Sequence, residues 1–290
     1  MKSEKKKVTP KLAREYLKSN WKNRTIRPSQ VGQIATDIRE GRWELNGEAL
    51  KFDVDGNMID GQHRCLAIIE SETEGVQTLV VTGLPRKVQR TLGGAISRNF
   101  ADELTMRGVS YASVASGAAK TCAVFERFGH WESKFVREIS MTDQGAAFDR
   151  NEDAIMASTL KIVRLYGANK GGHFLPTQAM MAGLYIQFAR HDLEVADHFV
   201  DRCYTGIGLE EDDPIYRLRR LFNPRDIHRR MGFALRNAVV IKAFNLVCEG
   251  REVRHLTWRR TGPHPEPFPR IGVYDPPEED VDQGDLDLED

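Results

Sequence analysis

The residues best suited to chemistry in this chain are Asp60, Gly61, Gln62, His63 and Arg64, which follow one another between two short apolar runs. Asp60 offers a carboxylate, and His63 offers a group that titrates near neutral pH. Arg64 offers a planar cation that can bind two oxygens at once. Gly61 permits a left-handed turn and a close approach of the backbone to a ligand. These residue types in this order predict an anion site, with phosphate as the usual ligand.

The flanking residues predict how this site is positioned. Residues 50–59 have the alternation of two short strands around a hairpin turn at Asp55 and Gly56. The apolar run 65–69 then suits a helix of about three turns. At the start of such a helix the first backbone N–H groups have no partner within the helix and carry the positive end of its dipole. The pattern therefore predicts a phosphate site at a junction of strand, glycine turn and helix.

The segment 60–64 resembles the phosphate-binding motif of the ParB/sulfiredoxin superfamily. That motif is Gly-Glu-Arg-Arg in ParB partition proteins, Gly-Cys-His-Arg in sulfiredoxins and Asp-Gly-His-x-Arg in free-serine kinases. The preceding residues also resemble ParB proteins, with an arginine at Arg24, an amphipathic helix and a closing glycine at Gly41. With a following strand at 77–81, the resemblance covers roughly residues 8–85. Chains with such a head and an unfamiliar helical tail are common among the ParB-like nucleases of bacteriophages.

The resemblance implies that the head binds a nucleoside triphosphate, ATP or CTP, together with Mg²⁺, and that it hydrolyses the nucleotide or transfers a phosphoryl group. Asp60 would bind the metal, cap the helix or serve as a base, and His63 would donate to a phosphate or act as an acid. Five residues are predicted to bind the phosphates: Arg24, Gly61, Gln62, His63 and Arg64.

The chain also departs from the superfamily. Sulfiredoxins need a cysteine where this chain has Gln62, and Cys65 lies in an apolar run that predicts burial, so reduction of a sulfinic acid is not expected. ParB proteins have a glutamate in place of Gln62, a second arginine in place of His63, and a helix-turn-helix that is not recognisable here. The general-base glutamate of serine kinases has only Glu48 as a candidate, on proximity alone.

The resemblance of the head, together with the helical patterns that follow it, implies an α+β protein with two domains and a tail, and the length allows one large or two ordinary domains. The 290 residues, of which 40% are hydrophobic, suffice for a substantial core. We expect an α/β head over residues 1–95, an α-helical domain over 96–262, and a proline-rich, acidic and disordered tail over 263–290. Residues 1–8 are expected to form a basic, frayed leader. Helices are expected at 10–20, 28–40, 86–92, 98–107, 110–128, 151–166, 176–190, 192–203, 214–222 and 226–248.

The formal net charge is zero, from 42 basic and 42 acidic residues, but the charges are unevenly distributed. The segment 217–260 is basic, and Trp258 would add a plane for stacking, so this segment is a candidate surface for DNA. The alternative is a solvated helix face paired with the acidic tail, which would also compete with DNA for that surface. The cations assigned to nucleic acid are Arg229, Arg230, Arg259 and Arg260.

The spacing of the cysteines indicates the cellular compartment in which the protein is expected. Cys65, Cys122, Cys203 and Cys248 lie far apart, which fits reduced thiols better than disulfides or a zinc site. The start of the chain has no signal-peptide pattern, and no apolar run is long enough to span a bilayer. We therefore expect a cytoplasmic protein without a membrane partner, and the sequence does not indicate its oligomeric state.

Three functions follow from these patterns and stay open at this point. The first is an NTPase or phosphotransferase in DNA-related metabolism. The second is a ParB-like nuclease or DNA-binding protein, although metal-dependent cleavage needs clustered carboxylates and only Asp60 and the hairpin aspartates are available. The third is a non-catalytic adaptor that senses a nucleotide.

Overall fold

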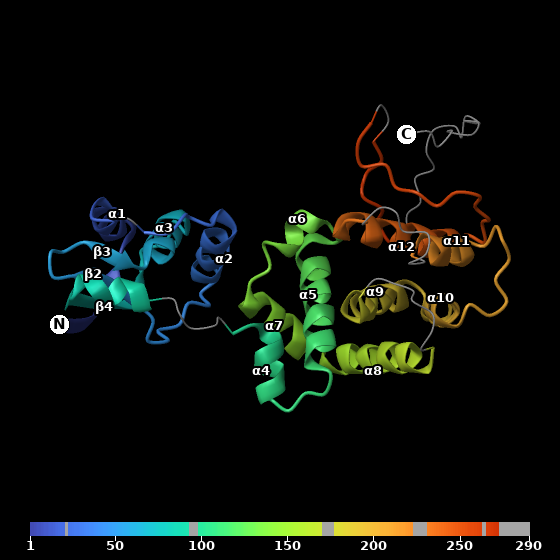
Figure 1. Cartoon of the computed structure of the whole chain (residues 1–290), viewed down its shortest axis with the longest axis horizontal. Helices are drawn as coiled ribbons and strands as arrows, with labels where there is room; N and C mark the ends of the chain where they lie inside the picture. Colours follow the sequence, from blue (N-terminus) through green and yellow to red (C-terminus); the bar gives the residue numbers. More distant parts are fainter. Residues whose placement is uncertain (21–22, 93–97, 170–176, 223–230, 263–264, 273–290) are drawn as a thin grey trace. The chain divides into compact units, whose positions relative to one another are not determined.

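The computed structural model describes residues 1–20, 23–92, 98–169, 177–222, 231–262 and 265–272. Within these ranges the chain forms one four-stranded sheet and twelve α-helices (Figure 1). The protein is therefore α+β, as the sequence predicts. None of the helices described is long and apolar enough to cross a membrane.

The chain divides into two compact units. The N-terminal unit comprises Met1–Glu103 and Arg137–Gly145, and the helical unit comprises Leu104–Val136 and Ala146–Asp290. Each unit is described by itself below. The N-terminal unit contains the sheet and the residues of the predicted phosphate site.

The sheet has the strand order β1-β4-β2-β3. Its strands are β1 (Lys2–Val8), β2 (Ala49–Asp53), β3 (Met58–Asp60) and β4 (Val76–Leu84). The central pair, β2 and β4, is parallel, whereas β1 with β4 and β2 with β3 are antiparallel. The hairpin of β2 and β3 confirms the prediction from residues 50–59, and it brings the end of β3 beside the centre of the sheet.

The prediction of a frayed leader over residues 1–8 is wrong. Lys2–Val8 form the edge strand β1, which pairs with β4 from Lys2 opposite Thr82 to Val8 opposite Val76. Pairing with a distant strand, and not local propensity, makes this segment a strand. Only Val8 at its end is fully buried, so the segment lacks the alternation that would have identified it. Its lysines also discourage a further strand from pairing with this edge.

Three helices pack together beside the sheet: α1 (Pro10–Lys18), α2 (Pro28–Arg39) and α3 (Gln62–Glu70). Figure 1 shows α3 between α1 and α2, and α3 contacts both. Thr9 caps α1 by accepting a hydrogen bond from the Leu12 N–H, and Pro10 occupies the first turn, as the sequence predicts.

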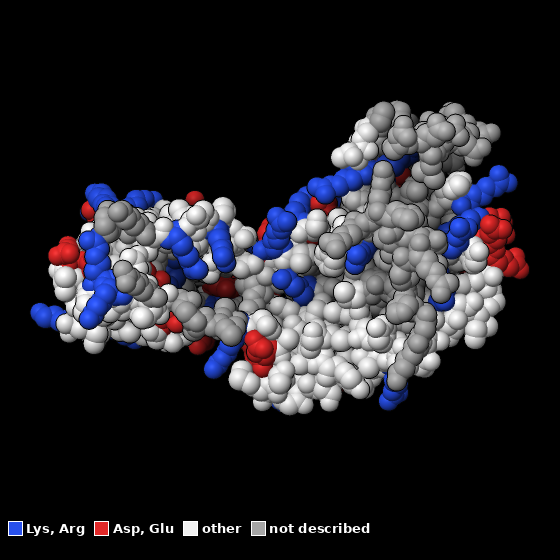
Figure 2. Space-filling model, viewed as in Figure 1, with Lys and Arg blue, Asp and Glu red and all other residues white. Residues whose placement is uncertain are grey.

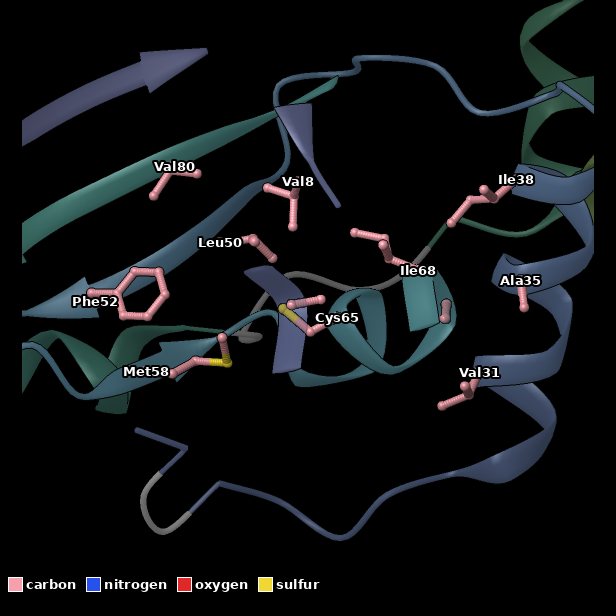
Figure 3. Close-up of a cluster of buried hydrophobic side chains, with 12 residues drawn as sticks. Val8, Val31, Ala35, Ile38, Leu50, Phe52, Met58, Cys65, Ile68 and Val80 are labelled. Carbon is pink, nitrogen blue, oxygen red and sulfur yellow. The ribbon is translucent and has the colours of Figure 1, made fainter. Parts of the chain in front are cut away.

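The core of the N-terminal unit joins these helices to the sheet (Figure 3). None of the ten labelled side chains is more than 6% exposed. The strands contribute Val8, Leu50, Phe52, Met58 and Val80, and the helices contribute Val31, Ala35, Ile38, Cys65 and Ile68. Because α3 buries Cys65 and Ile68 in this core, its first turn has a fixed position relative to β2 and β3.

The segment 137–145 belongs to the N-terminal unit because its polar groups bind α2 and the residues after it. The Arg42 guanidinium lies 2.6 Å from Asp37 Oδ1 and 2.8 Å from Asp143 Oδ1. The Ser140 hydroxyl donates to Asp37 Oδ1 at 3.1 Å, and the Gln33 amide donates to the Arg137 carbonyl at 2.7 Å. With Glu40, which also pairs with Arg42, three carboxylates around one guanidinium form a connected network, which is worth more than separate surface ion pairs.

The remaining elements are helical. They are η1 (Arg86–Thr91, a 3₁₀ helix), α4 (Phe100–Met106), α5 (Ala112–Phe128), α6 (Ser133–Val136), α7 (Met141–Arg150), α8 (Glu152–Ala168), α9 (Gln178–His191), α10 (Leu193–Thr205), α11 (Pro214–Leu221) and α12 (Phe233–Cys248). The short helices α6 and α7 were not predicted. The helix predicted from residue 226 begins at Phe233, because Gly232 takes an extended conformation as its N-cap; residues 226–230 lie outside the described ranges.

The core of the helical unit centres on α9, which packs against α5, α8 and α10. Phe188 of α9 stacks on Phe244 of α12 with ring centroids 3.9 Å apart, and Phe199 of α10 meets Phe244 edge-on at 5.5 Å. All three rings are fully buried. The aromatic cluster therefore joins three helices at one point.

Candidate functional site

The predicted phosphate site lies where β3 ends at Asp60 and α3 begins at Gln62. Gly61 connects them in the left-handed region, with φ 110° and ψ 3°. A Cβ at this position would lie 2.5 Å from Leu50 Cδ2 in β2, so the glycine is required by space as well as by backbone conformation. The strand, glycine turn and helix start are confirmed, and the first turn of α3 has no side-chain cap.

Two buried side chains of this turn bind the segment that precedes α2. The Gln62 amide accepts from Asn20 Nδ2 at 3.1 Å and donates to the Arg24 carbonyl at 2.5 Å. His63 Nε2 accepts from the Arg27 N–H at 3.0 Å. Gln62 and His63 are each only 5% exposed. Both predicted phosphate ligands therefore use their side chains to hold the Asn20 side chain and the backbone of Arg24 and Arg27.

The hydrogen bond at Nε2 sets the protonation state of His63. Since Nε2 accepts, the neutral ring carries its proton on Nδ1. Burial lowers the pKa of His63, and the charges of Arg24 and Arg27 lower it further, against an opposing effect of Asp60. This geometry gives His63 a positioning role, and its Nε2 is not free to donate to a phosphate.

Asp60 and Arg64 form a small charged cluster with two residues of the preceding hairpin segment. Asp60 Oδ2 lies 3.0 Å from Lys51 Nζ and 3.4 Å from Arg64 Nη2. Glu48 Oε2 lies 3.8 Å from Arg64 Nη2. The other terminal nitrogen, Arg64 Nη1, is buried and has no hydrogen-bond partner within the described ranges. Nη2 of the Arg64 guanidinium is thus paired with carboxylates, whereas Nη1 has no hydrogen-bond partner among the described residues.

Lys51 was missed by sequence reasoning, although a signal for it existed. Lys51 lies directly opposite Asp60 in the antiparallel pair of β2 and β3. Opposite charges at such positions stabilise a sheet, and the hairpin register follows from the turn. Asn20 and Arg27 were also missed, and they gave no such signal because their contacts come from segments distant in the sequence.

The residues predicted to bind Mg²⁺ do not fit a metal held by the protein alone. Oxygen Oδ2 of Asp60 already meets two cations. In the part of the chain that the structure describes, no three His, Cys, Asp or Glu side chains come together as a metal site. Asp53 is only 2% exposed and accepts hydrogen bonds from the N–H groups of Asp55 and Asn57, so it shapes the hairpin turn.

Asp53 gives a prediction for acid stability. Burial alone would raise its pKa, but the hydrogen bonds from Asn57 and Asp55 outweigh burial and lower the pKa below the ordinary 3.8. A depressed pKa in the folded state stabilises the fold above pH values near 4, and this stabilisation is lost as the pH falls through the folded-state pKa. We expect Asp53→Asn to cost about 1–2 kcal/mol at neutral pH and to weaken the dependence of stability on pH below about 4.

Urea denaturation at neutral and acid pH measures this effect. Asp55→Asn is the matched control, because Asp55 is an exposed residue of the same turn. If the free energy of unfolding depended on pH below about 4 equally in wild type and Asp53→Asn, the stabilising role given to the Asp53 carboxylate would be contradicted.

Arg24 and Arg27 add positive charge beside the first turn of α3. Both residues are exposed, and no hydrogen bond or ion pair of either side chain is recorded among the described residues. After burial, the charges of Arg24 and Arg27 are the next causes that lower the pKa of His63. Figure 2 shows Lys and Arg side chains over much of the visible face of the N-terminal unit, with Asp and Glu between them. Among the described residues, Asp60 pairs with Lys51 and Arg64, and Glu48 pairs with Arg64.

The basic segment 217–260 uses many of its cations internally. Arg217 Nη2 lies 2.9 Å from Asp212 Oδ1, and Arg219 donates to the Tyr204 carbonyl at 3.1 Å. Lys242 Nζ lies 2.6 Å from Glu266 Oε2. These contacts occupy three cations of the segment with nearby groups, whereas the acidic residues of the tail, 273–290, lie outside the described residues.

The cations assigned to nucleic acid fall into three groups. Arg229 and Arg230 lie outside the described residues. Arg259 pairs with Glu266 at 3.4 Å, whereas Arg260 is exposed. The Trp258 ring meets Phe268 edge-on with centroids 5.3 Å apart and donates its N–H to the Pro267 carbonyl. DNA binding by this segment stays a prediction.

Cys65 is inert in this fold. It is fully buried on α3, and burial raises the pKa of its thiol to about 12. A thiol that stays protonated at neutral pH is a poor nucleophile. The predicted burial of Cys65 is therefore confirmed, in keeping with the expectation that this chain does not reduce sulfinic acids.

Comparisons with protein-family models, with curated proteins and with solved structures find no significant match for this chain.

Proposed function

We propose that the N-terminal unit is a ParB/sulfiredoxin-like domain that binds the phosphate groups of a nucleoside triphosphate, ATP or CTP, at the first turn of α3. One observation carries the proposal: Arg64 Nη1 is buried without a hydrogen-bond partner among the described residues. A buried N–H of a charged group without an acceptor costs about 1–3 kcal/mol or more. A phosphate oxygen is an acceptor that matches the guanidinium in charge and in geometry.

The helix start supplies further donors for the same anion. The first N–H groups of α3 have no partner within the helix, and Gly61 places no side chain over them. Arg24 and Arg27 are exposed beside this turn, where they can neutralise the outer phosphates. Lys51 binds Asp60, and this pairing reduces the repulsion between the Asp60 carboxylate and a bound anion.

Binding is the function that this geometry supports best, and hydrolysis or phosphoryl transfer is a further step of the proposal. Among the described residues, His63 Nε2 is occupied by the Arg27 N–H and Asp60 is paired with two cations. Neither group is placed as a free acid or base beside the Arg64 guanidinium. Release of inorganic phosphate has to be measured separately from binding.

The test is thermal unfolding of the full chain with ATP, CTP, GTP or ADP, each with and without Mg²⁺. A ligand at roughly a hundred times its Kd should stabilise the folded state by about 2.7 kcal/mol, a rise in Tm of a few degrees. We expect such a rise with one nucleotide in the wild type. It should be lost in Arg64→Ala and reduced in Arg64→Lys, which keeps the charge but not the planar fork.

Arg14→Ala is the matched control, because Arg14 is an exposed arginine of α1 in the same unit. It should bind the nucleotide as the wild type does. The proposal fails if no nucleotide raises the Tm of the folded wild type, or if Arg64→Ala keeps the full rise. In that case, salt-dependent retention on DNA would be the next function to test.

A further inference from the structure

The helical unit contains a cavity that has no part in the proposed nucleotide site. Its volume is about 120 Å³, and it lies between α5, the start of α9 and the start of α12. Most of its wall is apolar, and the residues that line it include Val124, Trp131, Met180 and Phe233. The Trp131 and Phe233 rings meet edge-on with centroids 5.3 Å apart. The cavity is partly open to solvent, and its volume compares with about 150 Å³ for a closed, dry protein cavity that accepts benzene.

The wall of this cavity is formed by closely packed helices. A Cβ on Gly117 of α5 would lie 2.5 Å from Ala179 Cβ of α9, and both residues line the cavity. One turn further along α5, Thr121 makes the same kind of contact: a Cβ on Gly183 of α9 would lie 2.5 Å from Thr121 Cβ. Helices in such close contact cannot shift freely, so the cavity exists before any ligand arrives.

Lys120 is the one charged residue among those that line the cavity. It is half-buried on α5, and no hydrogen bond or ion pair of its ammonium group is recorded within the described ranges. Burial lowers the pKa of Lys120, which means that its surroundings disfavour the positive charge. A negative group placed beside this ammonium would offset that cost.

We propose that this cavity binds a small aromatic monocarboxylate, with the ring against Trp131 and Phe233 and the carboxylate on the Lys120 ammonium. The volume limits the apolar part to about one six-membered ring. The two aromatic rings of the wall favour another ring in offset or edge contact. A neutral hydrocarbon would leave Lys120 unpaired, and a multiply charged phosphate would find only one cation.

Titration of the full chain with benzoate, followed by calorimetry, tests this inference, with benzyl alcohol as the neutral ring of similar size. We expect wild type to bind benzoate more tightly than benzyl alcohol. Lys120→Met should weaken benzoate about tenfold to a hundredfold, the usual effect of one charged hydrogen bond, and should leave benzyl alcohol unchanged. Val124→Phe should abolish both by filling the cavity.

Lys11→Met is the matched control, because Lys11 is an exposed lysine of α1 in the other unit. It should bind both compounds as wild type does. Circular dichroism establishes that each variant is folded, and Val136→Phe fills the cavity from α6 if Val124→Phe does not fold. Three results would overturn the inference: no benzoate binding by folded wild type, equal loss in Lys11→Met, or benzoate affinity unchanged in Lys120→Met.

Discussion

Replacing Gly61 with alanine is expected to destabilise the N-terminal unit by about 2–5 kcal/mol, the sum of a left-handed backbone and an overpacked core. The φ of 110° is disfavoured for any residue with a Cβ. The new methyl group would also lie 2.5 Å from Leu50 Cδ2 and 3.2 Å from Leu50 Cα. The second of these is a backbone atom of β2, a strand bonded on both sides, so it cannot move without disturbing the sheet.

Gly56→Ala separates the two causes. Gly56 also has a positive φ, of 81°, but a Cβ there would meet nothing within 4 Å. We expect a cost of about 1 kcal/mol from backbone strain alone. Hydrogen exchange of peptides from β2, α3 and β4 measures the local stability of this unit in each variant. Equal loss of protection in the two variants would show that the contact with Leu50 has no effect.

The second large effect is expected for Phe244→Ala, which should destabilise the helical unit by about 3–5 kcal/mol. The Phe244 ring is fully buried and touches both Phe188 and Phe199. Its removal would leave a void between three helices that have little freedom to close it. Phe244→Leu, which keeps most of the volume, should cost less than about half as much.

Phe233→Ala is the matched control, since Phe233 begins the same helix but is 50% exposed. Its loss should cost about 1 kcal/mol or less, because half of its surface already faces water. Urea denaturation followed by circular dichroism compares the three variants with wild type. Similar midpoints for Phe244→Ala and Phe233→Ala would contradict the role of the aromatic cluster.

The sequence predicts those parts of the fold that are determined by neighbouring residues. Thr9 and Pro10 mark the start of α1, Pro28 marks the start of α2, and the hairpin and the glycine turn at Gly61 lie where their local patterns predict. In each case the cause lies within a few residues, such as a side chain that caps a helix or a glycine that permits a positive φ.

The parts that were not predicted depend on partners far away in the sequence. The strand β1 exists because β4 lies beside it, although its lysines alone indicate a solvated leader. The role of His63 depends on the Arg27 N–H, and that of Gln62 depends on Asn20 and the Arg24 carbonyl. The residue types alone were enough to predict where the candidate site lies. The role of each residue depends on its hydrogen bonds, and these could be seen only in the folded structure.

The network around Arg42 determines whether the protein can be divided into fragments that each contain one complete unit. Since 137–145 belongs to the N-terminal unit, the chain passes between the two units three times, after residues 103, 136 and 145. A fragment that ends at residue 103 would lack Ser140 and Asp143, and would leave Asp37 and Arg42 without those partners. No single cut in the chain releases either unit whole. Ligand binding to the N-terminal unit therefore has to be studied in the uncut protein.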